Sequence, residues 1–136
     1  MPGRAVPLIV RISATDWTED GWTVDDSVVL AGLLSEIGVD LIDCSSGALV
    51  PYAKIPAGPG FQTPFAAAIR QAADIPTGTV GLITSPQQAE QIVATGQADV
   101  VLLARQLLRD PFWPLHAAKA LKADVPWPVQ YERAQD

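Results

Sequence analysis

Two arginines and one glycine in this chain have the chemistry and the placement of an anion site. Arg11, Gly81 and Arg105 each lie toward the carboxyl end of a short apolar run, which is the pattern of a buried strand. Arginine binds phosphate oxygens through parallel N–H donors, and glycine lets the backbone approach a ligand closely. A short helix expected over 106–109 would add free backbone N–H groups directly after Arg105. Together these residues indicate a phosphate site at the carboxyl edge of a parallel sheet.

Each of these residues also has an ordinary structural explanation. Arg105 could pair with a neighbouring acid, and Arg11 could simply neutralise Asp43 on the adjacent strand. Gly81 could be a packing glycine in a crowded strand, and the segment 45–47 could be a plain turn. The pattern of residues leaves both alternatives open at every one of these positions.

The other reactive side chains do not complete a catalytic centre. Cys44 is more typical of a buried small hydrophobic residue than of a nucleophile, because no histidine accompanies it. His116 stands beside apolar residues in the last expected helix, where a surface or boundary position is the simpler interpretation. One cysteine and one histidine cannot form a metal site of usual composition, so no metal is expected. Trp17 and Trp22, in the first long loop, could cover a ligand or pack over the rim.

The elements that must position these residues follow from apolar runs alternating with amphipathic segments. The expected strands are 6–13, 39–46, 77–84 and 98–105, and the expected helices are 25–38, 64–73, 86–96, 106–109 and 111–122. The first strand is expected to be buried on both faces, since only Arg11 interrupts its apolar run. Thr23 with Asp26 predicts a capping box, while Thr63 and Ser85 predict N-caps before a proline. Four parallel βα units with right-handed connections are the expected fold.

Length, composition and charge bound the class of protein. A chain of 136 residues with 49% apolar and 18% charged residues fits one globular domain over 1–136, whose end, 124–136, is expected to form an irregular tail. The net charge of −6, without a stripe of lysine and arginine, argues against a nucleic-acid partner. No apolar run reaches the ~18 residues that a membrane span needs. The first residues lack a signal pattern, so a cytoplasmic protein acting on small molecules is expected.

Five segments, in order, resemble a known enzyme family. They are PLIVRISATDW, GVDLIDCSSGALVP, TGTVGLIT, ADVVLLARQLLRDPFWP and PVQYER. Together they resemble the carboxyl-terminal part of the Old Yellow Enzyme family of NADH:flavin oxidoreductases. The nearest branch is that of the YqjM-like (NamA-type) bacterial NADPH dehydrogenases, which are ene-reductases. The resemblance extends from about residue 7 to residue 133, nearly the whole chain.

The resemblance implies a fold, a reaction and a set of binding residues. The fold would be α/β, as the carboxyl-terminal half of a (β/α)8 TIM barrel. The cofactors would be FMN and NADPH (or NADH), and the reaction would be the reduction of activated alkenes by hydride transfer through FMN. The implied cofactor-binding residues are Arg11, Ser46, Gly47, Gly81, Ala104, Arg105 and Arg133.

Each implied residue has a distinct role in the resemblance. Gly81, Ala104 and Arg105 would hold the FMN phosphate, which agrees with the anion site inferred from residue types. Arg11 would lie at the N1 edge of the flavin, where charge tunes its chemistry. Arg133 would reach into the site of a neighbouring subunit, which implies a homo-oligomer. The loop with Ser46 and Gly47 would line the ribityl side.

The resemblance also shows what this chain lacks. A full family member is more than twice as long, and this chain starts at the fifth strand of the family barrel. The substrate-binding histidine pair and the active-site tyrosine have no counterpart, so no catalytic residue is assigned and little turnover by this chain alone is expected. Half a barrel leaves open strand edges, which predicts pairing with itself or with a missing amino-terminal half. The alternative is a non-catalytic half-barrel that binds a phosphorylated ligand or assembles with another subunit.

Overall fold

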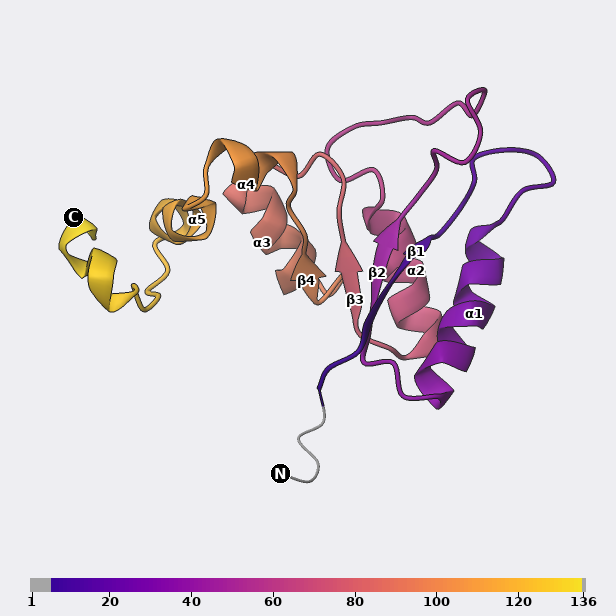
Figure 1. The fold of residues 1–136 in the computed structure, drawn as a ribbon, viewed down its shortest axis with the longest axis horizontal. Coiled ribbons are helices and arrows are strands. Elements are labelled where there is room, and N and C mark those ends of the chain that lie inside the picture. The colour runs from indigo at the N-terminus through magenta and orange to yellow at the C-terminus, as the bar shows by residue number, and fades with distance from the viewer. Residues whose placement is uncertain (1–5, 136) are drawn as a thin grey trace.

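The computed structural model describes residues 6–135 and contains one parallel sheet in the order β1-β2-β3-β4 (Figure 1). Its strands are β1 (Ile9–Ser13), β2 (Leu41–Ser45), β3 (Thr77–Thr79) and β4 (Val100–Val101). The helices are α1 (Val24–Glu36), α2 (Thr63–Ala73), α3 (Pro86–Ala94), α4 (Arg105–Arg109) and α5 (Trp113–Leu121), followed by the 3-10 helix η1 (Val129–Ala134). The predicted α/β fold class, four parallel βα units forming part of a barrel, is confirmed.

The helices begin where local side chains satisfy their first N–H groups. Thr23 and Asp26 form the predicted capping box of α1, each side chain accepting from the other residue's backbone N–H. Ser85 caps α3 as predicted, accepting from the N–H of Gln88. The N-cap predicted at Thr63 is wrong by one residue, because Gln62 occupies that position and Thr63 is already helical.

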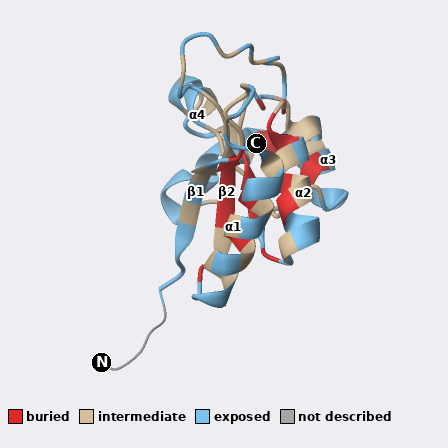
Figure 2. Cartoon of the chain, turned by 90° about the vertical axis from the view of Figure 1, so that its right-hand side faces the viewer, coloured by how far each residue is buried: buried red, intermediate tan, exposed pale blue. Residues whose placement is uncertain are grey.

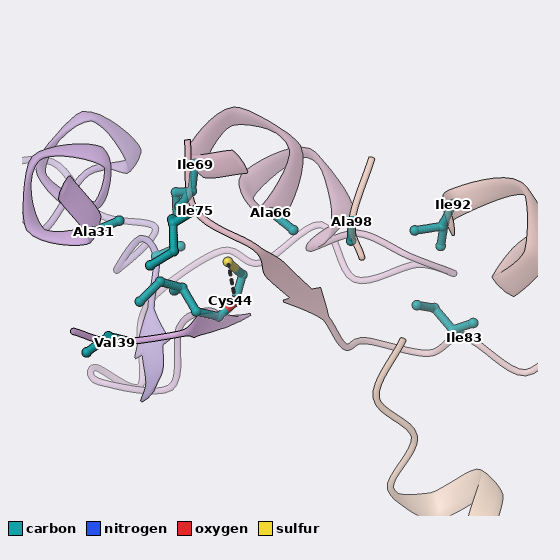
Figure 3. Packing of buried hydrophobic residues seen from close by; sticks show 11 residues of the cluster. Ala31, Val39, Cys44, Ala66, Ile69, Ile75, Ile83, Ile92 and Ala98 are labelled. Atoms are coloured by element: carbon teal, nitrogen blue, oxygen red, sulfur yellow. Dashed lines mark hydrogen bonds between the residues drawn. The ribbon is translucent and has the colours of Figure 1, made fainter. Parts of the chain in front are cut away.

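The core lies between the sheet and the helices that cover one of its faces (Figures 1 and 2). Side chains alternate along β2, so Ile42 and Cys44 point into this core while Asp43 points to the opposite face. Figure 3 shows Cys44 among the isoleucines and alanines that form it. The buried hydrophobic residues are Ala14, Ala31, Val39, Ile42, Cys44, Ala66, Ile69, Ile75, Ile83, Ile92, Ala98, Ala117 and Ala118. Most of them are small, so the core is thin.

Two expectations about the strands are corrected by the structure. β1 is not buried on both faces: it lies at the edge of the sheet, and Ile9 is 58% exposed. The strands expected over 77–84 and 98–105 are much shorter, because the chain leaves the sheet at Val80 and Leu102 to form the rim of the site. The tail expected over 124–136 contains a 3-10 helix within its described part, up to Gln135.

Arg70 and Asp99 connect α2 to the segment before β4, and this pair makes stability depend on pH. Arg70 Nε and Nη2 donate to the Asp99 carboxylate at 3.0 and 3.1 Å, and the Thr77 N–H donates at 2.9 Å. The hydrogen bond from Arg70 lowers the pKa of Asp99 below its usual 3.8. Because the folded pKa is the lower one, the stabilisation is complete above that value and is lost as pH falls through the folded pKa.

We therefore expect the free energy of unfolding to fall below pH 3.8 more steeply in the parent chain than in an Asp99→Asn variant. At pH 7 the variant should be less stable by about 0.5–1 kcal/mol, because both side chains are partly exposed and solvent screens the pair. Urea unfolding followed by tryptophan fluorescence at pH 3 to 7 measures both effects. Parallel pH profiles for the two proteins would contradict the assignment.

Candidate functional site

The segments that follow β3 and β4 enclose a hollow of about 120 Å³. Its lining residues are Val80, Gly81, Leu82, Ile83, Thr84, Leu102, Leu103, Ala104, Arg105, Gln106 and Arg109. The structure thus brings together three residues that the sequence predicted to share a site, namely Gly81, Ala104 and Arg105. They lie at the carboxyl ends of neighbouring parallel strands, the edge at which α/β folds bind ligands.

The charge of this hollow is positive and uncompensated. Arg105 is the first residue of α4, and no acidic side chain among residues 6–135 lies within 4.0 Å of its guanidinium. Arg109, one turn later, donates to the neutral Gln106 side chain at 3.2 Å. The lining contains no aspartate or glutamate. The ordinary explanation for Arg105, an ion pair with a neighbouring acid, is therefore absent from the described structure, and the hollow suits an anion.

Gly81 has a backbone that other residues rarely adopt. Its φ is +127°, and the next residue, Leu82, also has a positive φ of +53°. A Cβ built on Gly81 would lie 2.8 Å from Gln62 Nε2 and 2.9 Å from Phe61 Cε1. The packing explanation for Gly81 therefore holds together with the functional one. Leu82, a non-glycine residue at positive φ, adds backbone strain at the same place, and such strain is found at ligand sites.

Ser46 and Gly47 lie just after β2, where a hydrogen-bonded chain crosses the rim. Trp17 Nε1 donates to Ser46 Oγ at 3.0 Å, and Ser46 Oγ donates to Gln62 Oε1 at 2.7 Å. Gln62 Nε2 then donates to the Val80 carbonyl at 2.6 Å. Gly47 has a φ of +74°, and a Cβ there would contact Ile55 and the Trp17 ring. This series of hydrogen bonds connects the loop after β1 to the segment that lines the hollow. The Trp17 ring packs edge-on against Phe65 at the rim.

Arg11 lies deeper than the sequence suggested. Arg11 and Asp43 are register partners in the middle of β1 and β2, one layer below the rim, and not at the strand ends. Arg11 Nε donates to Asp43 Oδ2 at 2.5 Å, which is the pairing that the ordinary explanation anticipated. Asp43 is 4% exposed, whereas the Arg11 side chain is 56% exposed. Only Nε is engaged among the described contacts, so the terminal nitrogens remain available on the uncovered face of the sheet.

Arg133 is the one predicted site residue that the structure keeps apart from the rest. It lies in η1, which Figure 1 places beyond α5, at the end of the molecule away from β1. Tyr131 in the same segment packs edge-on against Phe112, at 5.5 Å between ring centroids. Arg133 therefore contributes nothing to the hollow of its own chain, and its predicted role in a neighbouring subunit stays a prediction.

The other reactive side chains serve structure. Cys44 is fully buried, and burial raises the pKa of its thiol to about 12, so the sulfur stays protonated and unreactive at neutral pH. His116 is exposed and contacts Asp110, with 2.7 Å between Nδ1 and Oδ2. Trp22 donates to Ser27 Oγ at 2.6 Å. No group of His, Cys, Asp and Glu suited to a metal ion occurs within residues 6–135.

A family model for the NADH:flavin oxidoreductase / NADH oxidase family matches residues 3–124 of this chain. The chain belongs to this family. Membership implies FMN and NAD(P)H as cofactors, as the sequence resemblance indicated. The match covers every predicted site residue except Arg133. FMN, the flavin of this family, carries a phosphate group, which is the kind of anion that the hollow suits.

Curated relatives give the family a more specific setting. The chain is 57% identical over 127 residues to NADPH dehydrogenase of Geobacillus thermodenitrificans, which covers 93% of this chain and 37% of that protein. It is 52% identical over 127 residues to NADPH dehydrogenase of Bacillus subtilis, with the same two coverages. The chain thus spans little more than a third of the length of these relatives.

Solved structures support the fold. Histamine dehydrogenase from Rhizobium sp. 4-9 matches 85% of this chain with a TM-score of 0.70, at 22% identity and over 17% of its own length. The amine oxidase for 6-hydroxypseudooxynicotine from Pseudomonas geniculata N1 matches with a TM-score of 0.65, also at 22% identity, over 85% of this chain and 18% of its own. Within residues 6–135, no helix combines the length and apolar character that crossing a bilayer requires.

Sequence reasoning missed Gln62. Gln62 occupies the N-cap position of α2, and its side chain, in a residue that is 4% exposed, contacts Ser46 and Val80 instead of capping the helix. In the sequence it is one polar residue in a loop rich in glycine and proline, and its partners lie 16 and 18 residues away. No local pattern marks such a residue, because what distinguishes it is a pair of contacts to distant segments.

Proposed function

We propose that this chain is the carboxyl-terminal, flavin-holding part of an FMN-dependent NAD(P)H oxidoreductase that reduces activated alkenes. Gly81, Ala104 and Arg105 hold the FMN phosphate in the hollow after β3 and β4. The observation that carries the proposal is the Arg105 guanidinium, which lines this hollow without an acidic partner in the described chain. Arg105 is exposed, so its guanidinium can meet a ligand from solvent, and arginine binds phosphate oxygens through parallel N–H donors.

The remaining cofactor contacts extend from the hollow across the sheet. Ser46 and Gly47, at the carboxyl end of β2, line the ribityl side. Arg11 reaches the N1 edge of the flavin ring with its terminal nitrogens, while its Nε stays with Asp43. Bound FMN would supply hydride transfer from NAD(P)H to the alkene. The chain's own part is to bind the phosphate, and Arg11 places positive charge where negative charge develops on the flavin.

The chain alone is not expected to turn over substrate. It contains no assigned catalytic residue, and it spans 37% of the length of its relatives. The proposed complete enzyme is therefore an assembly, either with the amino-terminal half of the barrel or with a second copy. Arg133 would act in a neighbouring subunit, which fits its place in η1, apart from the hollow. We place this enzyme in the cytoplasm.

A second candidate function is a half-barrel that binds a phosphorylated ligand or another subunit without flavin chemistry. The observation that favours it is the contact between Arg11 and Asp43, which gives Arg11 a structural purpose of its own. Under this alternative the hollow binds phosphate whatever group carries it. FMN and a simple phosphate ester would then compete for the site with similar affinity.

The experiment that tests the proposal is a titration of FMN fluorescence with the 136-residue chain, with riboflavin as the phosphate-free control. FMN should be quenched and riboflavin should not. Arg105→Ala should weaken FMN binding about 10–100-fold, because a hydrogen bond to a charged group is lost. Arg70→Ala is the matched control, since that arginine is paired with Asp99 at the amino ends of the strands.

Equal quenching of FMN and riboflavin, or equal FMN binding by the parent and Arg105→Ala, would contradict the proposal. Absence of quenching by either flavin would show that this half does not hold the phosphate by itself. Competition by ribose 5-phosphate at the concentration at which FMN competes would favour the second candidate.

A further inference from the structure

The Gln62 side chain has a place in the structure that the flavin contacts do not account for. It is 4% exposed, and its amide lies between the end of β2 and the segment after β3. Its oxygen accepts from Ser46 Oγ at 2.7 Å, and its nitrogen donates to the Val80 carbonyl at 2.6 Å. Gln62 does not line the hollow. The backbone of residues 80–84 lines the hollow, and Gln62 contacts that backbone from the side away from the hollow.

The turn that contains Gln62 holds two consecutive carbonyl groups of that backbone. Gln62 Nε2 binds the Val80 carbonyl at 2.6 Å, and the Gly60 N–H binds the Gly81 carbonyl at 2.8 Å. In a planar trans peptide the C=O and the following N–H point in opposite directions. Holding the two carbonyls toward the turn therefore directs the N–H groups of Gly81 and Leu82 away from it.

These two N–H groups are free to bind a ligand. Neither donates a hydrogen bond to any residue in the range 6–135. Both belong to residues that line the hollow, which also contains the Arg105 guanidinium. Successive backbone N–H groups that point the same way form a concave site for anions. Gly81 and Leu82 both have a positive φ in this segment.

We propose that Gln62 is a positioning residue for the phosphate site, which it serves by fixing the peptide groups that follow Val80. The proposal rests on the proposed function, since it assigns Gln62 to the same hollow. Gln62 itself touches neither cofactor nor substrate. Its effect is on the selectivity of the site for a phosphate group over the same ligand without one.

The hydrogen-bonded chain across the rim explains why an amide is needed. Trp17 donates to Ser46, Ser46 donates to Gln62, and Gln62 donates to the Val80 carbonyl. Ser46 and Gln62 each accept one hydrogen bond and donate the next, so the amide is held with its oxygen toward Ser46, at the end of β2, and its nitrogen toward Val80. A carboxylate in its place could accept from Ser46 but would repel the carbonyl. A chain of this kind also strengthens each of its bonds.

The test compares three variants of the 136-residue chain with the parent. Gln62→Glu keeps the size of the side chain and its acceptor but loses the donor, and Gln62→Leu loses both. Ser46→Ala removes the bond that orients the amide and leaves the amide itself. FMN and riboflavin binding are measured by fluorescence, and the order parameters of the Gly81 and Leu82 amides are measured by NMR without any ligand.

We expect Gln62→Glu and Gln62→Leu to weaken FMN binding about tenfold, which lowers the preference for FMN over riboflavin, with a smaller loss in Ser46→Ala. The order parameters of Gly81 and Leu82 should fall from about 0.85 to below about 0.6 in both Gln62 variants, while those in α3 stay constant. A purely structural role would instead lower the midpoint of unfolding and leave the order parameters of Gly81 and Leu82 in the folded chain unchanged.

Unchanged order parameters in Gln62→Leu would overturn the proposal whatever the flavin measurements show. So would FMN selectivity retained by both Gln62 variants. Failure of the proposed function gives a different result, because the parent chain itself would then not prefer FMN to riboflavin. In that case the order parameters still decide whether Gln62 fixes the segment after Val80.

Discussion

Gly81→Ala is expected to lower the free energy of unfolding by about 3 kcal/mol, one of the largest effects of any single methyl group added to this chain. Two causes act together. Alanine at a φ of +127° is strained, and its Cβ would lie 2.8 Å from Gln62 Nε2 and 2.9 Å from the Phe61 ring. Urea unfolding followed by tryptophan fluorescence measures the change in stability, and FMN titration measures the accompanying loss of binding.

The chain provides a matched control for this substitution. Gly32 lies within α1 at a negative φ, and a Cβ there would have no neighbouring atom within 4 Å. Gly32→Ala should therefore raise the free energy of unfolding by about 0.5–1 kcal/mol, because alanine has the higher helix propensity. Similar destabilisation by the two substitutions would refute the conformation described for Gly81.

Ile69→Ala should destabilise the chain by about 2–5 kcal/mol, because it opens a cavity beneath the sheet. Ile69 lies on α2 with no exposed surface and is, with Ile42, the largest fully buried side chain in the described structure. Many of the other core residues are alanines, whose short side chains cannot reach into the space. A domain is commonly stable by about 5–15 kcal/mol, so this loss should remove a large part of the total stability.

Leu108→Ala is the comparison for Ile69→Ala. Leu108 is 83% exposed on α4, and its truncation should change stability by less than about 0.5 kcal/mol. Circular dichroism during thermal unfolding follows both variants. Equal midpoints of unfolding for Ile69→Ala and Leu108→Ala would show that the chain does not form the core described here.

The order of strands and helices followed from the sequence because each βα unit has its own signals. Apolar runs, caps such as Ser85 and Thr23, and helix-ending glycines are local features, and they act in the same way whatever the rest of the chain does. Strand lengths were less accessible. Residues 80–84 and 102–104 are as apolar as the strands before them, but here they form the walls of the hollow. Amino-acid composition does not distinguish the residues of a buried strand from apolar residues that line a hollow beyond the end of the strand.

The sequence could predict those parts of the candidate site that depend on the type of a residue and not on its contacts. Gly81 and Arg105 could be singled out from residue type alone, because glycine permits unusual backbone conformations and arginine carries a guanidinium, and the structure places both in the hollow. Arg11 was placed at the rim, whereas register with Asp43 fixes it one layer below. Gln62 could not be found, since its importance comes from a bond to the backbone of Val80. Function that is carried by the shape of the main chain leaves little trace in the sequence.

The unequal lengths of the two outer strands affect how copies of this chain can associate through their open edges. β1 has five residues along one open edge of the sheet, whereas β4 has only two along the other. A growing fibre needs each copy to offer two complementary edges, because head-to-tail contacts alone continue without limit. β4 is too short to be a template of that kind. Association through β1 would instead close on itself as a symmetric pair, so this segment should resist open-ended aggregation even when it is separated from the rest of a barrel.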